Sequence, residues 1–101
     1  MIKHIVMFKL KAEADNKTAY KNAEEAKEKL ANFVESIPTL KSLEVGINAK
    51  GAPQENCELV LVCDFEDLDG LEAYRVHPVH VAFGKYITPL RESRACIDYE
   101  Y

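Results

Sequence analysis

Two segments of this sequence are apolar on both faces of an extended strand, which limits the folds open to a chain of 101 residues. The segments span residues 2–10 and 57–65, and each has apolar side chains at alternate positions on one face. The opposite face is apolar in its middle as well, where the side chains are Ile5, Met7, Val60 and Val62. Such strands need a cover on both sides of the sheet. One layer of helices therefore does not suffice.

The rest of the chain divides into alternating helical and extended segments. Apolar residues at spacings of three and four predict a helix over residues 16–37. Asp15 or Asn16 is suited to cap its start, and Pro38 ends it. The other predicted elements are strands at residues 42–48 and 93–100, a helix that begins after Asp67 and breaks at His77, and a helix from Pro78 to Pro89.

This order, β-α-β-β-α-β, predicts an α+β fold of the ferredoxin-like type with a four-stranded antiparallel sheet. The two strands that are apolar on both faces are then central, and the helices cover one side. Residues 1–101 form a single domain with no spare segment for the other side. We therefore expect a second copy to cover it, which gives a homodimer and a dimeric α+β barrel.

Composition excludes several classes of partner. The net charge is −4, and the lysines are scattered among glutamates, which argues against nucleic acid and anionic membrane. No apolar run approaches the roughly 18 residues of a membrane span, and the first residues do not resemble a signal peptide. Three cysteines without a close pair are typical of a reducing compartment. We expect a cytoplasmic protein whose partners are a second copy and a small apolar ligand.

Three segments carry a resemblance to a known family: HIVMFKL at residues 4–10, YRVHPVHV at residues 74–81 and DYE at residues 98–100. The sequence resembles the stress-responsive A/B barrel (Dabb) family over essentially its whole length. The resemblance implies a dimeric α+β barrel with a pocket between the helices and the sheet. The candidate pocket residues are His4, Val6, Phe8, Leu30, Leu59 and Leu61.

The resemblance extends to a plant polyketide cyclase of this family, which closes a ring by aldol condensation. Its catalytic pair corresponds to Tyr74 and His80, and a pocket histidine corresponds to His4. Leu30 and Leu59 stand where that enzyme has a tyrosine and a histidine. Because the ordinary pKa of histidine is about 6.5, a neutral imidazole is available to accept a proton at cellular pH. His80 is therefore a candidate general base, with Tyr74 as its partner.

Three functions remain open from the sequence. The first is a homodimeric protein with a small apolar pocket and an unassigned activity. The second is a cyclase-like lyase that promotes aldol condensation of a polyketide-type substrate. The third is a non-catalytic structural or assembly protein. A pocket lined by His4, Tyr74 and His80 favours the first two, and a core packed solid at these residues favours the third.

No metal or organic cofactor is expected. His77 and His80 lack the i,i+4 spacing that aims two rings at one metal. His77 precedes a proline and is expected to cap the following helix. The three arginines, Arg75, Arg91 and Arg94, are able to bind a carboxylate through paired hydrogen bonds. The favoured expectation is that they form surface or interface ion pairs with Glu72, Glu92 and Asp98.

Overall fold

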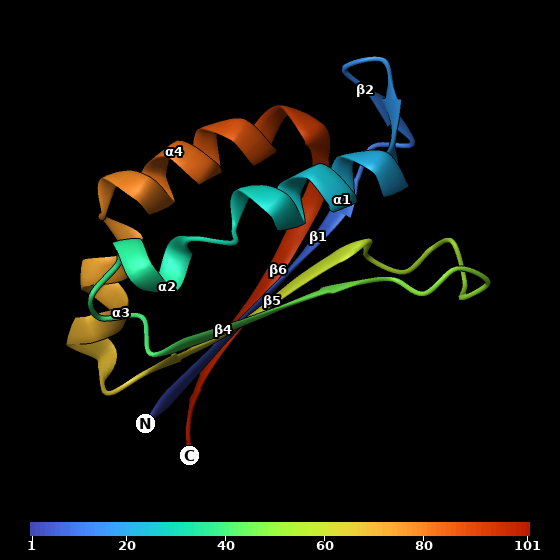
Figure 1. Cartoon of the computed structure of the whole chain (residues 1–101). Helices are drawn as coiled ribbons and strands as arrows, with labels where there is room; N and C mark the ends of the chain where they lie inside the picture. Colours follow the sequence, from blue (N-terminus) through green and yellow to red (C-terminus); the bar gives the residue numbers. More distant parts are fainter.

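The computed structural model describes all residues, 1–101, and its main feature is a four-stranded antiparallel sheet (Figure 1). Its strands are β1 (Ile2–Leu10), β4 (Ser42–Ile47), β5 (Leu59–Phe65) and β6 (Arg91–Glu100). They lie in the order β4-β5-β1-β6, with β1 antiparallel to both of its neighbours. The two strands that are apolar on both faces are the central pair, which confirms the predicted ferredoxin-like sheet.

All the helices lie on one side of this sheet (Figure 1). They are α1 (Ala19–Lys29), α2 (Phe33–Ser36), α3 (Leu68–Arg75), α4 (Pro78–Ile87) and the short 3₁₀ helix η1 (Thr88–Leu90). Asp67 caps α3 by accepting from the Gly70 N–H at 2.8 Å. His77 caps α4 by accepting from the Val79 N–H at 3.1 Å, as predicted. No helix has the length and apolar character that crossing a membrane requires.

The core lies between the helices and one face of the sheet. Along β5, alternate side chains are buried and half-buried, as a strand covered on one face requires. The buried residues of the central strands include Val6, Phe8, Leu59, Leu61, Cys63 and Phe65. The helices contribute Ala23, Ala26, Leu30, Phe33, Tyr74, Phe83 and Ile87. The predicted inward faces of both central strands are therefore correct.

The prediction of a helix start at Asp15 or Asn16 is wrong. Both residues have positive φ angles, 55° and 60°, and form the turn between β2 (Glu13–Ala14) and β3 (Lys17–Thr18). Aspartate and asparagine tolerate this left-handed conformation, and two such residues in succession suit a tight hairpin. Thr18 is the cap of α1, because its hydroxyl accepts from the Lys21 N–H at 3.1 Å.

The predicted helix over residues 16–37 is also interrupted. α1 ends at Lys29, and α2 begins at Phe33 after a short turn. Leu30, Phe33 and Ile37 are nevertheless all buried in the same core. The turn keeps these residues facing the core. Their apolar spacing therefore cannot reveal that the helix is interrupted between Lys29 and Phe33. The strand limits differ slightly too, since β5 begins at Leu59 and β6 at Arg91.

The second face of the sheet has no cover within the chain (Figure 1). Met7 is 41 % exposed there, and Ile97 and Tyr99 on β6 are 58 % and 43 % exposed. Val60 and Val62 on β5 are half-buried, although no helix covers this face. An exposed apolar patch of this kind marks an interface. We call this surface, with Ile5 at its middle, the open face.

An ion pair borders the open face at each end of the central strands. Lys3 contacts Asp64 at 2.7 Å, and Lys9 contacts Glu58 at 2.7 Å. The Asp64 carboxylate also accepts hydrogen bonds from the hydroxyls of Ser42 and Tyr101. These contacts, led by the hydrogen bond from Lys3, lower the pKa of Asp64 to about 2.

The contacts of Asp64 predict that the free energy of unfolding decreases as the pH falls. A carboxyl group whose pKa is lower in the folded chain binds fewer protons there than in the unfolded chain, so its contribution grows with pH. That contribution is present above the ordinary value of 3.8 and is lost as the pH falls through about 2. Urea unfolding should therefore show that Asp64→Asn destabilises the protein at pH 5, and that its difference from wild type shrinks toward pH 2.

Glu55→Gln is the matched control, because Glu55 lies in the exposed loop before β5 and forms no ion pair. Its difference from wild type should be small at every pH. A constant difference between Asp64→Asn and wild type from pH 5 to pH 2 would contradict the assignment.

Candidate functional site

A pocket of about 300 Å³ lies between the sheet and the helices α3 and α4. Its apolar lining comes from β1, β5 and α4 and consists of Val6, Phe8, Leu61, Phe83 and Ile87. Its polar lining includes His4, Tyr74 and His80, together with arginines from α3 and β6. The pocket therefore combines a hydrophobic floor with a few convergent polar groups, which is the usual character of a small-molecule site.

Most of the residues predicted for the pocket are found there. His4, Val6, Phe8, Leu61, Tyr74 and His80 all contribute to its lining. Leu30 and Leu59 are not part of this lining, and both belong to the packed core. The predicted position of the pocket, on the helix side of the sheet and away from the open face, agrees with this placement.

His80 has a defined tautomer. It lies in the first turns of α4, and its Nδ1 is 3.0 Å from the carbonyl oxygen of Arg75 at the end of α3. A carbonyl oxygen only accepts, so Nδ1 carries the hydrogen and Nε2 has the free lone pair. Nε2 has no hydrogen-bond partner within the chain. Burial is the main cause that lowers the pKa of His80 below 6.5, so the ring is neutral at neutral pH.

Tyr74 joins this pocket to the core. Its side chain is 2 % exposed, and its ring centroid lies 4.4 Å from that of His80 and 5.0 Å from that of Phe65. Burial, followed by the neighbouring Cys63 thiol, raises the pKa of Tyr74. Burial likewise raises the pKa of Cys63 to about 12. Both groups are therefore protonated, and the Tyr74 ring acts as a packed support for His80.

His4 is held by the edge strand. It lies opposite Asp98 in the β1–β6 register, and its Nδ1 is hydrogen-bonded to the Asp98 carboxylate. Its ring centroid is 6.1 Å from that of Tyr74. His4 is 8 % exposed, so its partner satisfies a polar group that is otherwise enclosed by apolar residues. The three predicted residues thus lie together, while their catalytic role stays a prediction.

The same corner contains three atoms that are potential metal ligands. His4, Cys96 and Asp98 each place one such atom within 4.8 Å of the others. The Cys96 sulfur is 3.6 Å from His4 Nδ1 and 3.9 Å from the Asp98 carboxylate. Sequence spacing could not reveal this cluster, because its members meet only through the register of β1 with β6. His77, by contrast, is occupied as a helix cap.

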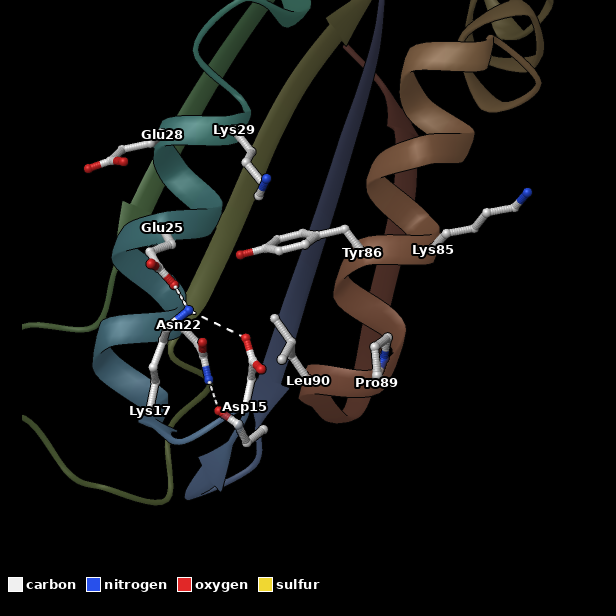
Figure 2. Close-up of a pocket in the computed structure, with 11 residues that line it drawn as sticks. Asp15, Lys17, Asn22, Glu25, Glu28, Lys29, Lys85, Tyr86, Pro89 and Leu90 are labelled. Atoms are coloured by element: carbon white, nitrogen blue, oxygen red, sulfur yellow. Dashed lines mark hydrogen bonds and ion pairs between the residues drawn. The ribbon is translucent and has the colours of Figure 1, made fainter.

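A larger hollow of about 840 Å³ lies between α1 and α4 (Figure 2). Lys17 forms ion pairs there with Asp15 at 3.4 Å and Glu25 at 3.0 Å. Lys29 lies over the ring of Tyr86, 4.6 Å from its centroid. Lys17 and Lys29 thus meet acidic or aromatic partners inside the chain, whereas Lys85 is exposed and has none. The hollow contains no histidine, and its mixed charges favour neither an anion nor a cation.

Comparison with known proteins gives a consistent result. The family model described as Stress Responsive A/B Barrel Domain matches residues 2–101. A dimeric ferredoxin-like protein of unknown function from Bacteroides fragilis is 36 % identical, with a TM-score of 0.85 over 99 % of this chain and 95 % of that one. A protein from Thermobifida fusca, also dimeric, ferredoxin-like and of unknown function, is 28 % identical. Its TM-score is 0.81 over 99 % of this chain and 90 % of that one.

A third solved structure, a Dabb family protein from Mesorhizobium loti, is 24 % identical with a TM-score of 0.76. The alignment covers 99 % of this chain and 95 % of that one, and supports the fold. No protein with a curated description matches the sequence. The relatives therefore establish the architecture and leave the chemistry to the residues of the pocket.

Proposed function

Since this chain belongs to the stress-responsive A/B barrel domain family, we propose that it is a homodimer whose protomers each bind a small, largely apolar compound and remove a proton from it. Dimeric relatives and the uncovered open face support the dimer. The pocket between the helices and the sheet supports the binding of a compound. The neutral ring of His80, with a free lone pair on Nε2, supports the removal of a proton.

The hydrogen bond from His80 Nδ1 to the Arg75 carbonyl is the observation that carries this proposal. It leaves Nε2 as a base in a pocket whose burial favours the neutral ring. A carbon next to a carbonyl group can give its proton to Nε2, and the electron pair then moves onto the carbonyl oxygen as an enolate. The imidazolium that forms returns the proton to carbon or to solvent. Proton transfer of this kind is the first step of the aldol condensation that a cyclase-like lyase would promote.

Proton exchange tests the proposal without knowledge of the substrate. We expect the wild-type protein to accelerate deuterium uptake at the central carbon of ethyl acetoacetate in D₂O, measured by NMR. His80→Ala should lower this acceleration by about 10²–10⁴-fold, the usual contribution of a general base. The wild-type rate should rise with pH through a pKa below 6.5 and then level off, because only neutral His80 accepts the proton.

His77→Asn is the matched control, because asparagine retains the helix cap while a neighbouring histidine is removed. It should exchange at the wild-type rate. Exchange at the buffer rate in wild type, or equal acceleration by His80→Ala, would sink the general-base proposal.

The same hydrogen bond also favours a non-catalytic alternative. It links the end of α3 to α4, and a protein of purely structural function would use it for that purpose alone. In that case wild type would show no acceleration, and His80→Ala would lower the melting temperature through loss of a hydrogen bond worth about 1 kcal/mol. Exchange and melting measured on the same variant therefore separate the two functions.

A further inference from the structure

All three arginines of this chain line the pocket, and no acidic residue does. Every other basic side chain that is permanently charged is a lysine, and the chain as a whole is acidic with a net charge of −4. An arrangement of this kind concentrates positive charge at one place on an otherwise negative molecule. The guanidinium group is moreover the basic group best suited to bind a carboxylate through two parallel hydrogen bonds.

Two of these arginines have no acidic partner within the chain. Arg75 is paired, because its guanidinium makes two 2.8 Å hydrogen bonds to Glu72. Arg91 and Arg94 form no ion pair. Asp98, the expected neighbour of Arg94, is instead bonded to His4. The positive charges of Arg91 and Arg94 therefore have no carboxylate partner within the chain.

An irregularity of β6 brings these two side chains to the same face. Residues three apart on a regular strand point to opposite faces of the sheet. In this strand, however, Arg94 lies opposite Phe8 while Arg91 lies opposite Leu10, because the register shifts between Lys9 and Leu10. Phe8 and Leu10 both face the helices and are buried. The bulge therefore aims both arginines at the helix side, a common use of bulges beside functional sites.

We propose that Arg91 and Arg94 bind the carboxylate of a small organic acid whose apolar part lies in the pocket. The proposal rests on the proposed function and names the class of compound that the same site takes. Val6, Phe8 and Phe83 supply the surface for the apolar part. Arg91 is half-buried and Arg94 is exposed, so the charged end of the compound lies at the mouth of the pocket.

Two further observations support this orientation. Arg94 is among the groups that lower the pKa of His80, after burial, so its charge reaches the base. The hollow between α1 and α4 offers a contrast, since Lys17 and Lys29 already meet Asp15, Glu25 or Tyr86 and acidic side chains belong to its lining (Figure 2). Of these two cavities, only the pocket that contains His80 has basic side chains and no acidic residue in its lining.

A pair of compounds of the same shape tests the proposal. The probes are 4-phenylbutyrate and its neutral amide, 4-phenylbutanamide, titrated separately into the 101-residue protein and followed by NMR. We expect the carboxylate to bind at least about tenfold more tightly than the amide, as charge-assisted hydrogen bonds require. Arg91→Gln with Arg94→Gln should abolish this preference and leave the affinity for the amide unchanged.

Lys85→Gln is the control for net charge, because it removes one cation from α4 outside this pocket. It should keep the preference for the carboxylate. Equal binding of both compounds by wild type, or a preference that survives the double arginine substitution, would overturn the inference while the general-base proposal stands. Binding of neither compound would reject the pocket itself as a site for apolar acids, and ethyl acetoacetate exchange would then show separately whether His80 acts as a base.

Discussion

Replacing Val62 with glutamate is expected to separate the proposed dimer into monomers or to unfold the chain. Val62 lies at the centre of the open face, opposite Ile5 on β1 and Glu44 on β4. A new carboxylate there would lie beside an existing one, and in the dimer it would be enclosed without a cation. Burying an unpaired carboxylate costs several kcal/mol, which exceeds what a hydrophobic interface tolerates at a single position. Light scattering at micromolar concentration measures the outcome.

Two companion variants keep this prediction decisive. Ile97→Glu changes a 58 % exposed residue on the edge strand of the same face, so it should produce a folded monomer. Val34→Glu places the same charge at a 43 % exposed valine on α2, on the helix side, and should remain dimeric. A monomeric wild type, or a folded Val62→Glu protein that stays dimeric, would refute the proposed use of the open face.

Truncation of Tyr74 to alanine should be the most destabilising change within one protomer. The ring is fully buried between His80, Phe65 and Phe33, with centroid distances of 4.4, 5.0 and 6.4 Å. Removing a buried aromatic ring costs about 3–5 kcal/mol, because the packing is lost and a cavity remains. Denaturant unfolding should show this loss, whereas Tyr20→Ala, at a half-buried surface position, should cost much less.

Tyr74→Phe separates the ring from its hydroxyl group. The hydroxyl is buried next to Cys63, and its pKa is raised, so we expect the ring contact with His80 to be the part that matters. The phenylalanine variant should fold and should retain most of the His80-dependent exchange. A loss of exchange as large as that of His80→Ala, with an unchanged fold, would instead assign a direct chemical role to the hydroxyl.

Much of the fold could be predicted because strand alternation is a local property of the sequence. A side chain on β1 or β5 faces the helices or the open face according to its position alone, so the inward positions of Val6 and Leu61 followed directly. The same alternation placed His4 on the helix side and Met7 on the other. The cap at His77 was equally local, because it depends on the proline that follows.

The tertiary structure decided what depends on register and on turns between buried residues. Leu30 and Phe33 are both buried, and the turn between α1 and α2 lies between them. The spacing of these apolar residues cannot show that the helix is interrupted there. The pairing of His4 with Asp98 depends on which residues of β1 and β6 lie opposite one another.

The two arginines without an acidic partner in the chain, Arg91 and Arg94, show most clearly that strand register cannot be predicted from the sequence alone. Arg91 and Arg94 share a face only because one strand carries an extra residue, which shifts every position beyond it to the other side of the sheet. The amino-acid sequence by itself therefore determined the sheet, its two apolar faces and the helical layer over one of them. The charge at the mouth of the pocket was decided by the tertiary structure, because strand register arises from contacts between distant segments rather than from the residues of one strand.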